Sequence, residues 1–367
     1  MGKIHERVYF DNAATTRVTE PVLQEALPYL TGYYGNPSST HHMGTVAKNA
    51  IVEAREKCAK AINADPEQIF FTSGATESNN IVTREFEYVL KSPYEHPSMQ
   101  GVVWGDLQTD LNKMQRAGIK NGLISCQTVN NELGTVFPTI AYADTAHEAG
   151  YKFMTDATQA FSHVIIDVKA QECDFLSLSG HKFHAPKGIG LLYIKEPDEF
   201  IKSAKHLNVG GGQEKGFRQG TENVFGIVAL GKAMELYDVT HEVRQHYHTL
   251  KTTLIKLLTE KCPVEFHINE IKGRRHLDNI ANISFKNISG ESLAILLDYA
   301  GFEISQGSAC HSASLEPSAV IKALNLPKEY ELGTIRISFS EKNTVAEVSA
   351  FVDKLCEIIG TLIKIKK

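Results

Sequence analysis

Lys182 and Asp156 are the two residues of this sequence whose types and surroundings point most directly to chemistry. Lys182 ends the segment Ser177-Leu-Ser-Gly-His-Lys182, between two apolar, strand-like stretches, and Asp156 follows the apolar run Tyr151-Lys-Phe-Met-Thr155. A lysine in such surroundings is costly unless it is solvated, paired or used covalently. Pyridoxal phosphate (PLP) needs both types, a lysine for its aldehyde and a carboxylate for its pyridinium nitrogen. Taken alone, Lys182 fits a surface lysine and Asp156 a helix cap, and it is their pairing that favours PLP.

The elements around these residues predict an α/β fold. Strand-like and helix-like segments alternate up to about residue 195, which indicates a mostly parallel sheet. Residues 173–179 alternate as a strand, Gly180 lets the chain turn, and residues 186–193 form a second apolar strand. Asp156 lies at the carboxyl end of its own strand, the edge where open α/β sheets bind ligands.

A third feature of this predicted edge is a small, hydroxyl-rich turn. The strand Ile69-Phe-Phe-Thr72 is followed by Ser73-Gly-Ala-Thr76, which opens a helix. Free N–H groups and the positive end of the helix dipole suit a phosphate at such a turn. The alternative is that these hydroxyl groups simply cap the helix.

The remaining pattern divides the chain into two parts. Further helices are expected over residues 21–30, 42–62, 140–149, 224–237 with a continuation towards 258, 291–300 and 344–363, and further strands over residues 8–10, 123–129, 264–268, 279–285 and 334–339. From about residue 263 the pattern changes to a compact α+β unit. We find no internal repeat and no low-complexity segment.

Composition and charge exclude several classes of protein. The chain has 367 residues, a formal net charge of -5 and no basic stripe, which argues against nucleic-acid binding. No stretch approaches the roughly 18 consecutive apolar residues of a membrane span. The N-terminus shows no apolar signal core, and the six cysteines have no CxxC pair or metal-ligand spacing. We expect a cytoplasmic protein with reduced thiols and no resident metal.

One cysteine and one arginine differ from the others of their type. Cys310 lies in a loop of Gly, Ser and Ala residues beside His311, where a thiol is exposed and can react once a base or a positive charge favours the thiolate. Arg336 lies in the middle of a predicted strand, where a guanidinium can clamp a substrate carboxylate. The alternatives are an incidental loop cysteine and a solvated strand arginine.

With these residues in place, the chain resembles the cysteine desulfurases, which are fold-type I PLP enzymes of the class V aminotransferase group. The loop around Cys310 resembles the nitrogen-fixation and iron–sulfur assembly branch. The matching stretches run in family order over almost the whole chain: Tyr9-Phe-Asp-Asn-Ala-Ala-Thr-Thr16, Gly35-Asn-Pro-Ser-Ser39, Phe71-Thr-Ser-Gly-Ala-Thr-Glu-Ser78, Glu95-His-Pro97, Asn130-Asn-Glu132, Asp156-Ala-Thr-Gln159, Ser177-Leu-Ser-Gly-His-Lys182, Arg218-Gln-Gly-Thr221 and Gly307-Ser-Ala-Cys-His-Ser-Ala-Ser-Leu-Glu-Pro317.

The resemblance implies an architecture. It predicts a large PLP-binding α/β domain over residues 16–245, with a mostly parallel sheet of the seven-stranded type between helices. A small α+β domain would combine residues 1–15 and 246–367 and carry the Cys310 loop. The family also implies a homodimer.

The resemblance also implies roles for individual residues. Lys182 would form the Schiff base and shuttle the α-proton, and Cys310 would take the sulfur of L-cysteine as a persulfide and release L-alanine. Asp156 would pair with the pyridine nitrogen, His96 would stack on the ring and take part in catalysis, and Gln159 and Asn131 would hydrogen-bond near the ring oxygen. The phosphate would be bound by Ala75, Thr76, Ser179 and His181, and by Thr221 of the other subunit. Asn36 and Arg336 would bind the substrate carboxylate.

Partners and alternatives follow from the same resemblance. The sulfur would pass to an acceptor such as an iron–sulfur scaffold, a tRNA-thiolation protein or a thiamine-pathway carrier, and Cys310 could transiently ligate a cluster on a partner.

The segment between His96 and Asn131 is shorter than is usual for the family, so we expect Gln100-Gly-Val-Val-Trp-Gly-Asp106 to have lost a strand or been rebuilt. Two alternatives therefore stay open: a selenocysteine lyase or other PLP-dependent lyase, and an inactive partner-binding homologue.

Overall fold

The chain forms two compact units. The computed structural model describes residues 7–204, 209–237, 240–306 and 316–366. The large unit comprises Thr16–Val129 and Phe137–Asp238, and the small unit comprises Met1–Thr15, Asn130–Val136 and Val239–Lys367. The division expected from the sequence differs from these units in two places, because residues 130–136 join the small unit and the second boundary lies before residue 245. Among the described residues, no helix is both long enough and apolar enough to cross a membrane.

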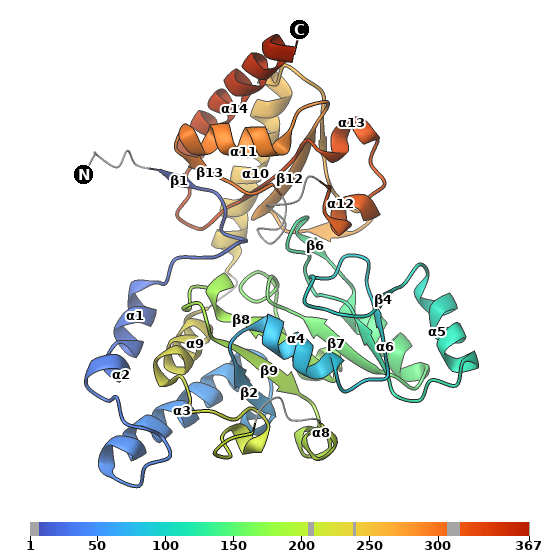
Figure 1. The fold of residues 1–367 in the computed structure, drawn as a ribbon. Coiled ribbons are helices and arrows are strands. Elements are labelled where there is room, and N and C mark those ends of the chain that lie inside the picture. Colours follow the sequence, from blue (N-terminus) through green and yellow to red (C-terminus); the bar gives the residue numbers. More distant parts are fainter. Residues whose placement is uncertain (1–6, 205–208, 238–239, 307–315, 367) are drawn as a thin grey trace. The chain divides into compact units, whose positions relative to one another are not determined.

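A seven-stranded sheet organises the large unit (Figure 1). Its strands, in spatial order, are β2 (Ile69–Thr72), β9 (Gly190–Ile194), β8 (Phe175–Ser179), β7 (Lys152–Asp156), β5 (Gly122–Ser125), β3 (Tyr88–Lys91) and β4 (Val102–Val103). The five strands from β8 to β4 are parallel, whereas β9 runs antiparallel to both β8 and β2. Strands β8 and β9 are buried throughout, as their apolar sequences predict. The predicted α/β fold with a mostly parallel, seven-stranded sheet is confirmed.

Helices pack on this sheet and on one another. They are α1 (Glu20–Ala26), α2 (Pro28–Thr31), α3 (His42–Ala61), α4 (Ala75–Thr83), α5 (Leu107–Arg116), α6 (Thr139–Glu148), α7 (Val168–Gln171), α8 (Pro197–Ser203) and α9 (Val224–Leu236), with 3₁₀ turns at Pro66–Gln68, Gly180–Lys182 and Glu214–Gly216. Helix α4 packs on β8 and β9, α6 on β7, and α3 on α9. The core of the large unit includes Phe70, Val82, Met99 and Leu192.

Two helices expected from the sequence are interrupted. The helix predicted over residues 21–30 is split into α1 and α2, because Pro28 has no N–H to continue α1 and instead starts α2. The expected continuation of α9 towards Leu258 is wrong. Tyr237 is extended (φ −84°, ψ 116°), and the next helix starts at a new cap in which the Thr240 side chain accepts a hydrogen bond from the Val243 N–H.

The small unit is an α+β structure. Strand β12 (Ile280–Phe285) pairs antiparallel with β10 (Phe266–Ile268) and β14 (Thr334–Ser338). Two short pairs complete the strands, β1 (Val8–Tyr9) with β13 (Phe302–Glu303) and β11 (Arg275–His276) with β6 (Thr135–Val136). The helices are α10 (His241–Lys261), α11 (Gly290–Tyr299), α12 (Ala319–Ala323), α13 (Lys328–Glu331) and α14 (Val345–Lys366).

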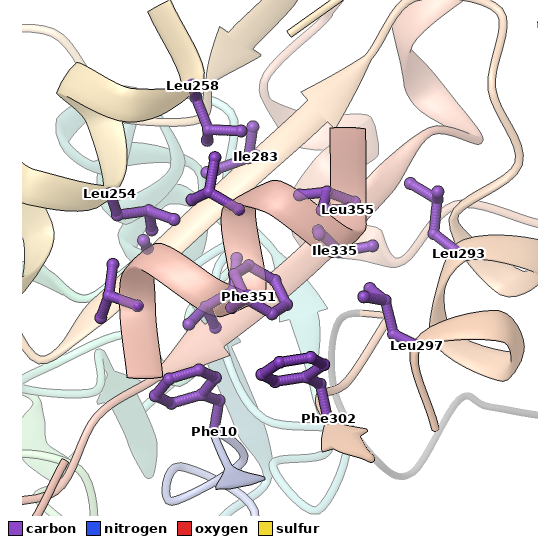
Figure 2. Packing of buried hydrophobic residues seen from close by; sticks show 14 of the residues in the cluster. Phe10, Leu254, Leu258, Ile283, Leu293, Leu297, Phe302, Ile335, Phe351 and Leu355 are labelled. Carbon is purple, nitrogen blue, oxygen red and sulfur yellow. The ribbon is translucent and has the colours of Figure 1, made fainter. Parts of the chain in front are cut away.

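The core of the small unit lies between its long helices and the three-stranded sheet. Figure 2 shows Phe10, Leu254, Ile283 and Phe351 in this cluster. The rings of Phe10 and Phe351 meet edge to face, with centroids 5.5 Å apart. The N-terminal strand region is therefore part of the same core as the C-terminal helix, which is why residues 1–15 belong to the small unit.

Candidate cofactor and active site

Three strand ends of the large unit carry the predicted cofactor residues to one edge of the sheet. Asp156 is the last residue of β7 and pairs in register with Ser177 of β8. Ser179, the last residue of β8, pairs with Gly190 of β9, which in turn pairs with Thr72, the last residue of β2. The ends of β2, β7 and β8 therefore lie near one another.

Lys182 lies in a single 3₁₀ turn, Gly180–Lys182, directly after β8. A Cβ atom at Gly180 would lie 2.9 Å from Ala185 Cβ and from Leu230 Cδ1, so a larger residue here would require these neighbours to shift. Thr16 holds the turn from outside: its N–H donates to the His181 carbonyl at 2.8 Å, and its hydroxyl accepts from the His184 N–H at 2.7 Å. Lys182 itself is half-buried. The turn is thus fixed by packing and hydrogen bonds, which gives the lysine a defined position.

Asp156 presents a buried carboxylate at the end of β7, with only 5% of the residue exposed. Oδ1 accepts the Thr158 N–H at 3.0 Å, and Oδ2 accepts Asn79 Nδ2–H at 3.0 Å. Two residues further along, Thr158 Oγ1 is buried with no hydrogen-bond partner within the described part of the chain. Buried hydroxyl groups normally have a hydrogen-bond partner, so this hydroxyl beside a fixed carboxylate indicates a site that a bound polar group completes. These groups fit the pyridine side of PLP.

The turn between β2 and α4 forms a cradle for an anion. Gly74 has φ +150°, and a Cβ atom there would lie 3.1 Å from Ser179 Oγ. The N-cap residue of α4 is Gly74, which has no side chain to cap the helix, so the first N–H groups, at Ala75 and Thr76, can bind an anion. Burial, together with the charges of two nearby lysines, lowers the pKa of His181 to about 4, so this imidazole is neutral at physiological pH. A helix N-terminus, a hydroxyl and a neutral imidazole fit a phosphate.

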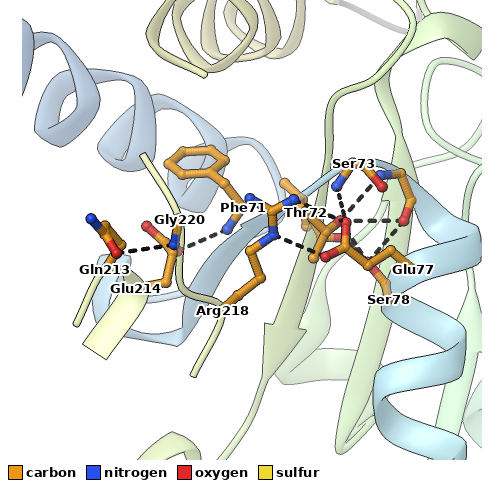
Figure 3. Close-up of polar contacts among 11 residues, drawn as sticks. Phe71, Thr72, Ser73, Glu77, Ser78, Gln213, Glu214, Arg218 and Gly220 are labelled. Atoms are coloured by element: carbon orange, nitrogen blue, oxygen red, sulfur yellow. Dashed lines mark hydrogen bonds and ion pairs between the residues drawn. The ribbon is translucent and has the colours of Figure 1, made fainter. Parts of the chain in front are cut away.

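The loop that carries Thr221 is fastened to this cradle (Figure 3). Arg218 Nε donates to Glu77 Oε1 at 2.9 Å, and the Glu77 carboxylate also accepts the Ser73 N–H. Burial alone would raise the pKa of Glu77, but the hydrogen bonds from Arg218 and Ser73 lower it below its ordinary value. Glu214 accepts the Phe71 N–H at 2.9 Å. Thr221 itself is exposed.

His96 belongs to a hydrogen-bonded chain that reaches Asp156. His96 Nδ1 lies 2.7 Å from Ser98 Oγ, which accepts Asn79 Nδ2–H at 2.9 Å. The same Asn79 nitrogen donates to Asp156, and Asn79 Oδ1 accepts the Ser177 hydroxyl at 2.6 Å. Sequence reasoning missed Asn79, Ser98 and Ser177, because their roles depend on contacts between separate elements.

The other predicted residues are distributed over both units. In the large unit Gln159 is buried just after β7, and Asn36 is exposed, with Oδ1 accepting the Ser38 N–H at 2.9 Å. In the small unit Arg336 is 1% exposed, and its Nη1 donates to the Asn131 carbonyl at 2.8 Å. Arg336 is therefore buried, unlike the solvated strand arginine that the sequence left open. Cys310 and His311 lie outside the described residues.

Comparison with known proteins decides the family. A family model described as aminotransferase class-V matches residues 8–99 and 103–351. The chain belongs to the aminotransferase class-V family. The predicted resemblance at the level of the family is thereby confirmed.

Relatives of known name cover almost the whole chain. "Cysteine desulfurase" of Trichormus azollae is 38% identical over 379 residues, covering 97% of this chain and 93% of that protein. "Cysteine desulfurase IscS" of Methanosarcina thermophila is 39% identical over 383 residues, covering 98% and 93%. Among solved structures, one described as "NIFS-LIKE PROTEIN" has a TM-score of 0.84 at 32% identity, covering 97% of this chain and 100% of that chain. Another, "SspA in complex with cysteine", has a TM-score of 0.75 at 33% identity, covering 92% and 100%.

The short segment after His96 is where the class-V match is interrupted, at residues 100–102. The structure shows that this segment retains a strand: Val102 and Val103 form β4, parallel to β3, and α5 follows. Asp106 caps α5 by accepting the Thr109 N–H at 2.9 Å. The seven strands of the fold-type I sheet are therefore present, with a two-residue strand at the edge next to the short segment.

Proposed function

We propose that this protein is a PLP-dependent cysteine desulfurase, which removes sulfur from L-cysteine, releases L-alanine and leaves a persulfide on Cys310. The observation that carries the proposal is the placement of Lys182 and Asp156 at the ends of the neighbouring strands β8 and β7, beside the anion cradle of α4. Support for the substrate comes from the relatives named cysteine desulfurase and from the similar structure described as a complex with cysteine.

Each of the predicted cofactor residues would contact a different part of PLP. Lys182 would hold the aldehyde carbon, Asp156 the ring nitrogen and His96 the ring face, with Gln159 and Asn131 near the ring oxygen. The phosphate would lie against Ala75, Thr76, Ser179 and His181. When bound, PLP supplies the electron sink that labilises bonds at the substrate α- and β-carbons.

The protein's own groups would then move protons and sulfur. Lys182 would carry the α-proton, since it is the basic group at the reacting carbon. The Cys310 thiolate would attack the sulfur of cysteine, so that an S–S bond forms and the Cβ–S bond breaks, with its electron pair passing to Cβ, which takes a proton. One L-cysteine and one thiol thus become one L-alanine and one persulfide.

Substrate binding and assembly complete the proposal. Asn36 and Arg336 would bind the cysteine carboxylate, the arginine by charge-assisted hydrogen bonds. The protein would act as a homodimer, with Thr221 of the partner subunit reaching the phosphate, since Thr221 is exposed on its loop. The persulfide would pass to an acceptor in the cytoplasm, such as an iron–sulfur scaffold or a tRNA-thiolation protein.

The test begins with the absorption spectrum of the purified protein. We expect a visible PLP band that changes on addition of L-cysteine, with alanine formed in proportion to sulfide under reducing conditions. Lys182→Ala should lose the band's response, and Cys310→Ala should keep the band but abolish alanine formation. Cys262→Ala, a partly exposed cysteine of the small unit, is the matched control and should retain activity. Turnover of selenocysteine but not of cysteine would replace the proposal with a selenocysteine lyase, and absence of PLP would leave an inactive homologue.

A further inference from the structure

Asn79, in the second turn of α4, is a fully buried hydrogen-bond hub with 0% exposure. A side-chain amide has two N–H donors and one carbonyl oxygen. Both donors are used, one to Asp156 Oδ2 at 3.0 Å and one to Ser98 Oγ at 2.9 Å, and Oδ1 accepts the Ser177 hydroxyl at 2.6 Å. Every side of the amide is therefore occupied by a specific partner.

The chemistry of these partners fixes which way the Asn79 amide points. The Asp156 carboxylate can only accept hydrogen bonds while it is ionised. A flipped amide would place Oδ1 against that carboxylate, oxygen against oxygen, between two buried residues. The observed orientation, with Nδ2 towards Asp156, is the only one that satisfies both groups.

This orientation determines where the Ser98 proton goes. Because Asn79 Nδ2 is a donor, Ser98 Oγ accepts from it and must use its single hydrogen elsewhere. His96 Nδ1 lies 2.7 Å from Ser98 Oγ and also accepts the Ser98 backbone N–H at 3.1 Å. Two donors thus converge on His96 Nδ1, which leaves no room for a hydrogen on that nitrogen.

We infer that Asn79 and Ser98 are positioning residues that orient the Asp156 carboxylate and hold His96 as the neutral tautomer protonated at Nε2. In this state the Nε2–H of His96 can donate a hydrogen bond to a reacting group, but Nε2 cannot take a proton. Proton abstraction is then left to Lys182. The inference rests on the proposed function only for the roles of His96, Asp156 and Lys182 towards cofactor and substrate.

Ring-nitrogen NMR of the holoenzyme tests the tautomer directly. The protein is deuterated and labelled with ¹⁵N in its histidine rings, and the His96 signals are assigned from their loss in His96→Gln. We expect a protonated Nε2 and an unprotonated Nδ1 at neutral pH. Ser98→Ala removes the hydroxyl donor and should give averaged signals of two tautomers. A protonated or averaged Nδ1 in the wild-type protein would overturn the inference.

Cofactor affinity tests the Asn79 contact with Asp156. Apoprotein is titrated with PLP, followed by fluorescence and by the pH dependence of the PLP absorption band. Asn79→Ala removes a hydrogen bond to a charged group, so we expect the dissociation constant of PLP to rise about 10- to 100-fold in this variant. Asn80→Ala is the matched control: Asn80 is the next residue of α4, its side chain donates to the backbone carbonyls of Thr76 and Ser98, and PLP binding should stay unchanged. Equal effects of both substitutions would reject the positioning role.

A folding defect, a failure of the proposed function and a failure of this inference give different results in these experiments. If circular dichroism shows that Asn79→Ala does not fold, the NMR comparison of wild type with Ser98→Ala still decides the tautomer. If the wild-type protein binds PLP but does not form alanine from cysteine, the proposed function fails while the NMR and PLP-binding results stand. If it forms alanine but His96 carries its proton on Nδ1, this inference fails and the function stands.

Discussion

Arg336 and Asp11 form a buried ion pair in the small unit, with Nη2 and Oδ1 2.7 Å apart and the arginine side chain 1% exposed. Nη1 is held by the Asn131 carbonyl, and Nε is buried without a hydrogen-bond partner within the described residues. A buried guanidinium is tolerated only when its charge is compensated and its donors are largely used. The ion pair and the Asn131 carbonyl thus hold the Arg336 guanidinium in place within the small unit.

Replacement of Asp11 should therefore be costly. Asp11→Ala removes one partner of a buried pair, so we expect the free energy of unfolding to fall by about 3–5 kcal/mol, measured by urea denaturation. Asp353→Ala is the control, because Asp353 pairs with Lys261 at 2.6 Å on the surface of the same unit, and its loss should leave the midpoint nearly unchanged. Similar small effects of both substitutions would show that Arg336 does not depend on Asp11.

Arg218→Ala should weaken retention of PLP. Its ion pair with Glu77 is partly buried and holds the turn that we propose binds the phosphate. Without Arg218 the Ser73–Glu77 turn loses a charge-assisted hydrogen bond, so we expect the dissociation constant of PLP to rise about tenfold. Lys215→Ala breaks the exposed Lys215–Glu67 pair on the same loop and serves as the control. An unchanged dissociation constant in Arg218→Ala would count against the cradle.

Glu95 should make stability depend on pH. Burial raises its pKa from 4.5 to about 8, against the opposing hydrogen bond from Ser125. Between these values the folded protein holds a proton that the unfolded chain releases, so the contribution of Glu95 to the free energy of unfolding falls as the pH rises. Each pKa unit corresponds to about 1.4 kcal/mol. The free energy of unfolding of Glu95→Gln should therefore rise, relative to that of the wild-type protein, by on the order of a few kcal/mol as the pH increases to about 8. The free energies of unfolding of both proteins are measured by urea denaturation at several pH values from about 5 to 8. A constant difference between the two proteins over this range would contradict the prediction.

Cys262 should be the fastest of the described cysteines to be alkylated. A hydrogen bond with Cys356 lowers its pKa to about 7, whereas burial raises the pKa of both Cys58 and Cys173 to about 12. At neutral pH a substantial fraction of Cys262 is therefore thiolate, the reactive form. Peptide mass spectrometry after timed iodoacetamide treatment measures each site, and Cys356→Ala should slow Cys262 about tenfold. If Cys262 reacts no faster than the buried thiols, the thiol pair does not activate it.

The sequence predicts the parts of the site that depend on local patterns. Asp156 ends a strand and Lys182 follows one because an apolar run, a polar residue and a glycine lie next to one another in the chain. The mostly parallel sheet follows from the same alternation of strands and helices. These features need no knowledge of contacts between elements, so a single sequence is enough to predict them.

The rest of the site depends on register between distant strands. Ser177 contacts Asn79 only because α4 packs on β8, and Ser98 joins them from the loop after β3, a strand that the sequence analysis did not predict. Residues 130–136 join the small unit because β6 pairs with β11, far along the chain. Such contacts have no local signal, and this is why the polar network and the unit boundary could not be predicted.

The antiparallel strand β9 has a consequence for the order of folding. It lies between β8, which directly precedes it, and β2, which belongs to the N-terminal part of the chain. The anion cradle, formed by Gly74 and Ser179 on either side of Gly190, can exist only after β9 has closed this long loop. Closing such a loop is entropically costly and slow, so it falls late in folding. Binding of the cofactor should therefore occur only after the sheet is complete. A folding intermediate in which β9 has not yet paired would contain Lys182 and Asp156 but would lack the phosphate-binding cradle.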